Sequence, residues 1–178
     1  LPASLKYIGD YAFGGAQKGT GLTAVELPAE LVRIGNNAFR NSKLTSVKIG
    51  EAVEYIGDAA FAGCPVAAVE YAAGNAKFGS IAAFNNNETK ATVTLTDTVT
   101  AFPADLFKNW TGVETVALGN GITAIPVNAF DGRAGLKNVT LGANLTEIGN
   151  YAFRGTGLIE VVLPEKLTLL GNGAFANC

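Results

Sequence analysis

Apolar residues recur along this chain in a pattern that repeats about every 23 residues. The most distinctive unit is an aliphatic residue, a glycine, two variable residues, an alanine and a phenylalanine, as in Ile148–Phe153. Eight of the ten phenylalanines fall in the column that this unit defines, at steps of 22 to 26 residues: Phe13, Phe39, Phe61, Phe84, Phe107, Phe130, Phe153 and Phe175. A fixed period of this length is typical of a solenoid, in which each repeat buries its apolar face only against its neighbours. We therefore expect the eight rings to form one continuous stack.

A second recurring segment predicts β-strands. It reads apolar-x-x-Val-x-apolar, as in Leu44–Ile49 and Leu136–Leu141, and its last three residues alternate around a β-branched centre. The end copies are Leu22–Leu27 and Leu158–Leu163. One such strand per repeat predicts a parallel sheet along one side of the solenoid. A shorter extended segment before each Ile-Gly pair, for example Leu31–Ile34, predicts a second row of strands on the opposite side.

The residues between the short segment and the phenylalanine predict a corner. Glycine after the aliphatic residue suits a sharp turn, and the Asp or Asn that follows, such as Asp58, is placed to cap a single helical turn. The repeat over residues 72–92 is degenerate, because it keeps Phe84 but lacks the Ile-Gly-Asx sequence. We expect about eight repeats in a single domain over residues 1–178. Since both ends fall within a repeat, we also expect the chain to be a fragment of a longer protein.

Composition and charge argue against several classes of protein. Apolar residues make up 48% of the chain and charged residues 16%, which is too apolar for a disordered segment. The net charge is −2 with no basic stripe, so we expect no nucleic-acid partner. No apolar run approaches the ~18 residues of a membrane helix, so we expect no membrane insertion within this chain.

The residues needed for catalysis are not assembled in the sequence. Histidine is absent, so no serine has a histidine to activate it and the commonest metal ligand is missing. Cys64 and Cys178 occupy the same repeat position five repeats apart, or about 24 Å at the spacing of stacked strands. A disulfide needs Cα atoms within about 7 Å. We therefore expect two free, buried thiols, no metal, no cofactor and no enzymatic activity.

Taken together, the Leu-x-x-Ile-Gly-x-x-Ala-Phe and Leu-x-x-Val-x-Leu patterns resemble the BspA-like class of leucine-rich repeats. The resemblance covers essentially the whole chain and is weakest over residues 72–92. It implies a curved, right-handed, mainly β solenoid from a secreted or cell-surface protein. It also implies adhesion to host, matrix or other cell-surface proteins, and it supplies no catalytic residues.

Candidate binding residues lie at outward positions. In the second row of strands, we expect the outward positions of the first four repeats to be large: Tyr7, Arg33, Tyr55 and Phe78. Aromatic residues and arginine are enriched at interface hot spots, so these four are candidates for a binding stripe for protein or glycan. The alternative is that they stack on one another and only cover the core. Trp110 follows a longer loop and is either a protruding anchor or a loop-packing residue.

Two functional hypotheses follow from these features. The first is a non-catalytic interaction or adhesion module, extracellular or on the cell surface, that displays its repeats to a protein or glycan. The alternative is a structural spacer that projects another domain of the parent protein.

Overall fold

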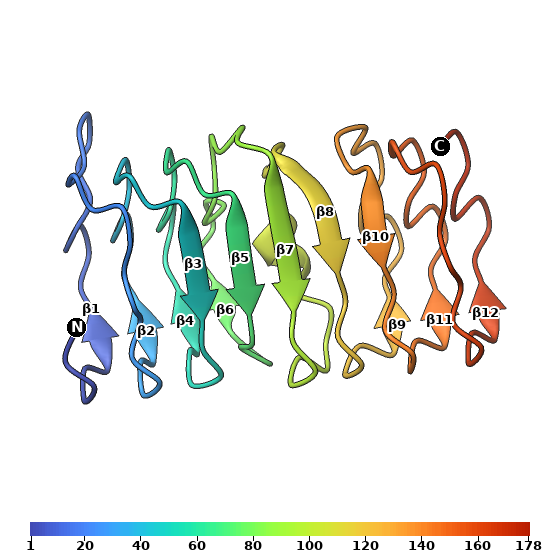
Figure 1. Ribbon diagram of the computed structural model, residues 1–178, viewed down its shortest axis with the longest axis horizontal. Helices are drawn as coiled ribbons and strands as arrows, with labels where there is room; N and C mark the ends of the chain where they lie inside the picture. The colour runs from blue at the N-terminus through green and yellow to red at the C-terminus, as the bar shows by residue number, and fades with distance from the viewer.

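The computed structural model describes all residues, 1–178, as a parallel β-solenoid of about seven turns with repeats of about 23 residues. The coils lie side by side along the long axis, with the two termini at opposite ends (Figure 1). Helix is almost absent: the only helical segment is the 3₁₀ turn η1 (Ala104–Phe107). The predicted repeat architecture is confirmed.

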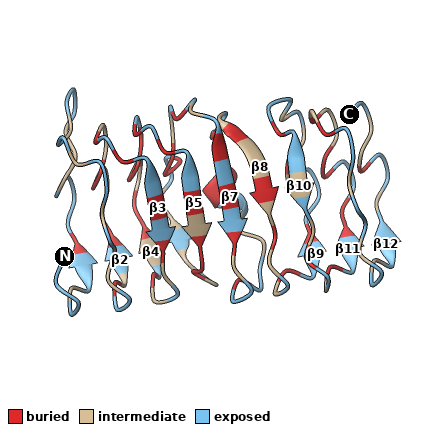
Figure 2. Cartoon of the chain, viewed as in Figure 1, coloured by how far each residue is buried: buried red, intermediate tan, exposed pale blue.

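The main sheet holds five parallel strands in the spatial order β10-β8-β7-β5-β3. Equivalent valines lie opposite one another in register, so Val47, Val69 and Val93 form one buried column. Alternate residues point outward, as the exposed positions of Figure 2 show. The strands are β3 (Ser46–Ile49), β5 (Ala68–Tyr71), β7 (Ala91–Leu95), β8 (Val113–Ala117) and β10 (Asn138–Thr140).

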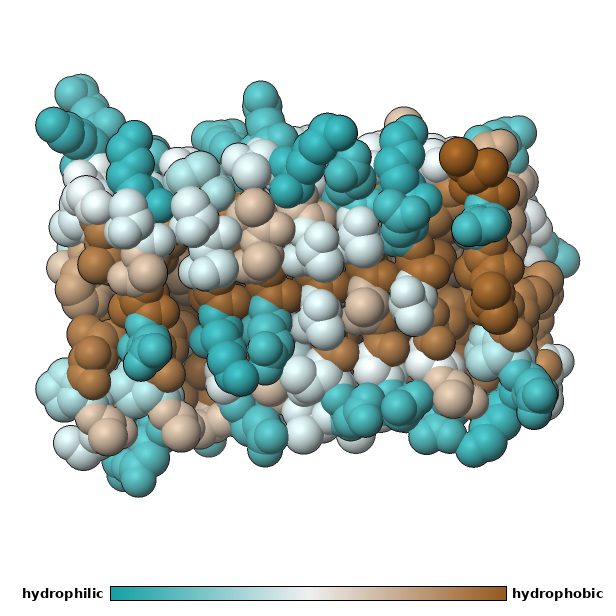
Figure 3. Space-filling model, viewed as in Figure 1, coloured by the Kyte–Doolittle hydropathy of each residue, from teal (hydrophilic) through white to brown (hydrophobic).

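The predicted strands in the first and last repeats are wrong. Leu22–Leu27 and Leu158–Leu163 both lack strand structure, so the main sheet stops short of each end. In the last repeat, Ile159 is 96% exposed and Val162 is 87% exposed. Figure 3 shows a hydrophobic area, in brown, at the C-terminal end of this face.

The opposite side carries the predicted short strands, but in two separate sheets. The first has the order β1-β2-β4-β6 and the second has the order β12-β11-β9. Between these two sheets, the segment that contains Phe102 and η1 contributes no strand to this side of the solenoid. The row of short strands therefore has a gap there. The strands are β1 (Tyr7–Ile8), β2 (Arg33–Ile34), β4 (Tyr55–Ile56), β6 (Lys77–Phe78), β9 (Ala124–Ile125), β11 (Glu147–Ile148) and β12 (Leu169–Leu170).

The phenylalanine column fills the core, but its stack is interrupted. Rings from Phe13 to Phe84 lie 5.0–5.2 Å apart and nearly parallel, and the rings of Phe130, Phe153 and Phe175 continue in the same way. Phe84, however, stacks on Trp110, with 4.2 Å between ring centroids. Phe107 packs instead against Phe102 and Phe130. The prediction of one continuous stack is therefore corrected to two stacks that are offset at the irregular coils.

The corner residues act between coils rather than within one. Asp58 does not cap a helical turn: its Oδ1 accepts a hydrogen bond from the main-chain N–H of Ile81 in the next coil, at 2.8 Å. Asn36 Oδ1 accepts in the same way from the N–H of Asp58, at 2.8 Å. Asp10 Oδ1 accepts from the N–H of Asn36, at 2.7 Å. The predicted cap is thus replaced by a ladder of side chains that joins successive coils.

Candidate binding surfaces

The structure brings three of the predicted stripe residues into one row. Parallel pairing places Tyr7 beside Arg33, Arg33 beside Tyr55 and Tyr55 beside Lys77, all at outward positions of the short strands. Tyr7 is 64% exposed and Tyr55 is half-buried, while Arg33 and Lys77 are exposed. We call Tyr7, Arg33, Tyr55 and Lys77 the aromatic–cation row.

Arg33 stacks on its neighbour within this row. Its guanidinium carbon lies 4.2 Å from the centroid of the Tyr55 ring. Such a contact contributes about 0.5–1 kcal/mol at an exposed site. The stacking that was expected as the alternative is therefore present, and Arg33 remains exposed in it.

Phe78 does not belong to the stripe. It pairs with Ile56, which points inward, and it packs partly buried against the core. The outward place in this coil belongs to Lys77. The error is a shift of one residue, which moves a side chain to the other face of a strand. The sequence contained the signal, because Lys77-Phe78-Gly79 aligns with Tyr55-Ile56-Gly57.

Trp110 is not a protruding anchor. Its side chain is fully buried and stacks on Phe84, so its role is loop packing. The indole Nε1–H is the one buried side-chain polar group without a hydrogen-bond partner. A buried ring of this kind is held by its packing and is not available to a partner.

The outer face of the main sheet offers no comparable anchor. Many of its central outward side chains are small and pale in Figure 3, and hydrophilic groups lie along the rims and on the N-terminal half of the face. Lys48 and Glu70 form an ion pair of 2.8 Å on adjacent strands, but both side chains are exposed. Exposed pairs of this kind contribute little stability.

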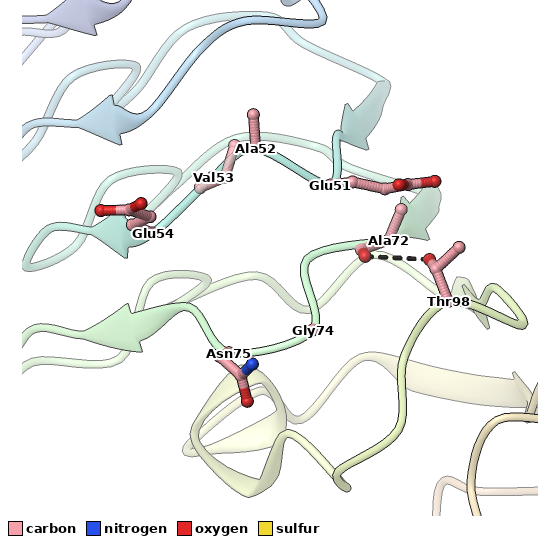
Figure 4. Close-up of a pocket in the computed structure, with 8 residues that line it drawn as sticks. All are labelled: Glu51, Ala52, Val53, Glu54, Ala72, Gly74, Asn75 and Thr98. Atoms are coloured by element: carbon pink, nitrogen blue, oxygen red, sulfur yellow. Dashed lines mark hydrogen bonds between the residues drawn. The ribbon is translucent and has the colours of Figure 1, made fainter.

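A groove of about 400 Å³ opens at the corner between the coils of β4 and β6. Glu51 and Glu54 lie on one side and extend in opposite directions, while Asn75 on the other side points away from both (Figure 4). Thr98 closes one end by donating a hydrogen bond of 3.1 Å to the carbonyl of Ala72. No group of three or more His, Cys, Asp or Glu side chains is placed to hold a metal ion.

The two cysteines are free, and they differ in environment. Cys64 is buried, and its thiol donates to the carbonyl of Phe39 at 3.0 Å and lies 3.3 Å from the Ser42 hydroxyl. Burial raises the pKa of the Cys64 thiol, and the hydrogen bond with Ser42 offsets part of that shift. Cys178 is exposed, so the expectation of two buried thiols is wrong for this residue.

We expect this difference to appear as two rates of thiol modification. With Ellman's reagent at pH 8, Cys178 should react fast. Cys64 should react at a rate at least about 100-fold lower than that of Cys178, because only a thiolate that is exposed by local opening can react. Cys64→Ser should remove the slow phase and leave the fast one unchanged. Equal rates for both thiols in the native protein would contradict the buried position of Cys64.

The geometry defines a leucine-rich repeat solenoid, and a family match makes the class more specific. Residues 1–80 and 75–178 match the BspA type leucine rich repeat region in six copies. The chain therefore belongs to this family. No curated protein matches the chain. No helix reaches the length and apolar character that a membrane crossing requires.

Two solved structures are similar at low identity. A leucine-rich repeat protein from Bacteroides ovatus is 18% identical with a TM-score of 0.35, over 100% of this chain and 69% of that chain. The pneumococcal vaccine antigen PcpA is 18% identical with a TM-score of 0.37, over 99% of this chain and 58% of that chain. The family assignment rests on the repeat match and not on these two structures.

Proposed function

We propose that this chain is a non-catalytic interaction module of a secreted or cell-surface protein, and that the aromatic–cation row contacts a protein partner. The observation that carries the proposal is the parallel register that places Tyr7, Arg33, Tyr55 and Lys77 side by side at outward positions. Membership of the BspA type repeat family supports the extracellular setting.

The chemistry of the row favours an acidic protein segment. Tyrosine and arginine provide large contact area together with hydrogen-bond donors, and both are enriched at hot spots. Arg33 and Lys77 are the cations in the row, and neither forms an ion pair within the chain. At about 4.8 Å between strands, the row spans roughly 14 Å, which fits an extended segment of four or five residues. A carboxylate of the partner could bind Arg33, while the partner's neighbouring side chains pack on the rings of Tyr7 and Tyr55. Such a segment would use both the cation and the aromatic surface of the row.

The test is a binding screen with matched variants. The chain is measured by biolayer interferometry against a panel of purified matrix and cell-surface proteins. For a protein that binds, Tyr7→Ser combined with Tyr55→Ser should weaken affinity by about 30-fold or more, the size of a hot-spot effect of about 2 kcal/mol. Arg33→Gln should weaken it separately.

Tyr151→Ser is the control for this screen. Tyr151 is also an exposed tyrosine, with the guanidinium carbon of Arg154 4.6 Å from its ring centroid, but it lies outside the row. Unchanged affinity in the Tyr7 and Tyr55 variant would exclude the row as the contact. If no protein on the panel binds, the result favours the alternative, a spacer that projects another domain.

A further inference from the structure

A cavity of about 280 Å³ opens at the gap between the two short-strand sheets. It lies between β6 and the coil that carries η1, where the solenoid is least regular. The sequence pattern alone does not reveal it, because the gap exists only when the two coils are stacked. The side chains and main-chain positions that matter are Tyr71, Gly74, Asn75, Phe78, Phe102 and Asp105.

Aromatic residues gather at this cavity in place of aliphatic ones. Only two of the ten phenylalanines lie outside the core column, Phe78 and Phe102, and both line the cavity. They take the inward position that Ile56 occupies in the preceding coil. Tyr71 likewise replaces the aliphatic residue of its column, where the next strand has Leu95. Three departures from the repeat thus converge on one place.

Two polar side chains at the cavity, Tyr71 and Asp105, lack partners within the protein. Tyr71 is 1% exposed and lines the cavity, yet its hydroxyl forms no hydrogen bond within the protein. Burial raises the pKa of Tyr71, so the hydroxyl stays protonated and available as a donor. Asp105 is exposed in the first turn of η1 and forms no ion pair.

Asn75 adds a second unusual polar group. It stands where the neighbouring coil has the buried apolar residue Val53. Instead of filling the corner it is exposed, and its amide points toward the coil that carries η1 (Figure 4). Aromatic side chains that merely plugged the gap would leave no cavity.

We propose that this cavity binds a single neutral sugar ring, as the terminal residue of a glycan. The apolar C–H face of such a ring packs on Phe78 and Phe102, while its hydroxyls meet the Asn75 amide, the Asp105 carboxylate and the Tyr71 hydroxyl. Apolar and aromatic walls with a few polar groups are typical of small-molecule sites. The volume falls just below the range of about 300–1,000 Å³ for drug-sized ligands, which favours one ring over an extended chain.

Other ligand classes fit this lining less well. An anion would face Asp105, and no lysine or arginine lines the cavity. A metal ion would find a single carboxylate, although cations of this kind prefer several oxygen ligands. A purely apolar group would leave the Tyr71 hydroxyl unpaired, which costs about 1–3 kcal/mol. The site does not depend on the aromatic–cation row, and its test is separate.

Saturation-transfer NMR tests the proposal with the methyl glycosides of glucose, galactose, mannose and N-acetylglucosamine as probes. At least one should show saturation of its ring C–H protons with a Kd in the millimolar range, which corresponds to about −4 kcal/mol. Tyr71→Phe removes only the hydroxyl and should weaken the binding of that sugar by about tenfold. Asp105→Asn should also weaken it, while Tyr7→Ser should leave it unchanged.

A matched pair of variants provides the decisive control. Ala101 and Ala124 occupy the same exposed outward position in successive coils, but only Ala101 lines the cavity. Ala101→Trp should abolish sugar binding, and Ala124→Trp should leave it intact. Absence of saturation transfer from the native protein to any of the four glycosides would overturn the proposal, and so would binding that survives Ala101→Trp. Binding of N-acetyl-lysine methylamide in place of every sugar would also overturn it and identify a peptide pocket.

Discussion

Replacing Phe61 with alanine should lower the free energy of unfolding by about 3–5 kcal/mol, the range for removing a fully buried aromatic side chain. Phe61 is completely buried and lies between two parallel rings, with centroids 5.2 Å from Phe39 and 5.0 Å from Phe84. Its loss leaves a cavity in the narrow interior of the coil and removes a stacking partner from both neighbours. Urea unfolding followed by circular dichroism measures the change.

Phe175→Ala is the matched control, because it removes the same side chain from the same column. Phe175 is only partly buried and stacks on a single ring, that of Phe153 at 5.1 Å. In a solenoid each repeat interacts only with its neighbours, so we expect less than half of the Phe61 effect. A loss of similar size in both variants would show that stability does not depend on the stack at Phe61.

The period of the chain was sufficient to predict the architecture. One phenylalanine and one short strand pattern per repeat can be buried only if equivalent residues of successive coils meet. The parallel register then follows, as the Val47, Val69 and Val93 column shows. The prediction was strongest where the repeats are most alike, because each regular coil has nearly the same environment.

Irregular coils limited the prediction at the level of single residues. Phe78 was assigned to the wrong face because residues 72–92 match the repeat poorly, and a shift of one residue exchanges the two faces of a strand. Trp110 was ambiguous because its place depends on how Phe84 and Phe107 are offset, which no local pattern specifies. Lys77 was missed as the result of the same shift.

The corner residues show a second limit. An Asp or Asn after glycine is a sound local signal for a helix cap. In this solenoid, however, the main-chain N–H of the equivalent residue one coil away is within hydrogen-bond reach, as for Asn36 and Asp58. The competition between a local and a non-local N–H donor for the side-chain oxygen is settled by the stacking distance, which the sequence does not encode locally. The cavity beside Tyr71 was missed for the same reason, since its walls come from two successive coils.

Replacing Gly57 with alanine should destabilise the protein by about 1–3 kcal/mol or more, as expected for overpacking against a rigid neighbour. A Cβ at this position would lie 2.5 Å from the main-chain nitrogen of Asn36 and 2.6 Å from the carbonyl carbon of Gly35. These atoms belong to the adjoining coil, where the N–H of Gly57 donates a hydrogen bond of 2.8 Å to the carbonyl of Ile34. The coils must therefore separate at the ladder of Asp and Asn side chains to admit one methyl group.

Gly9→Ala distinguishes this steric effect from the general preference for glycine at a corner. Gly9 holds the same repeat position in the first coil, but a Cβ there would meet nothing within 4 Å. Without a clash, the substitution should be neutral or should stabilise the protein by up to about 1 kcal/mol, because alanine restricts the unfolded chain. Thermal unfolding of the two variants should thus give shifts of different size and, in the clearest case, of opposite sign. Equal destabilisation by both would mean that the corner requires glycine for its own backbone conformation, and that close approach of the coils is not the cause.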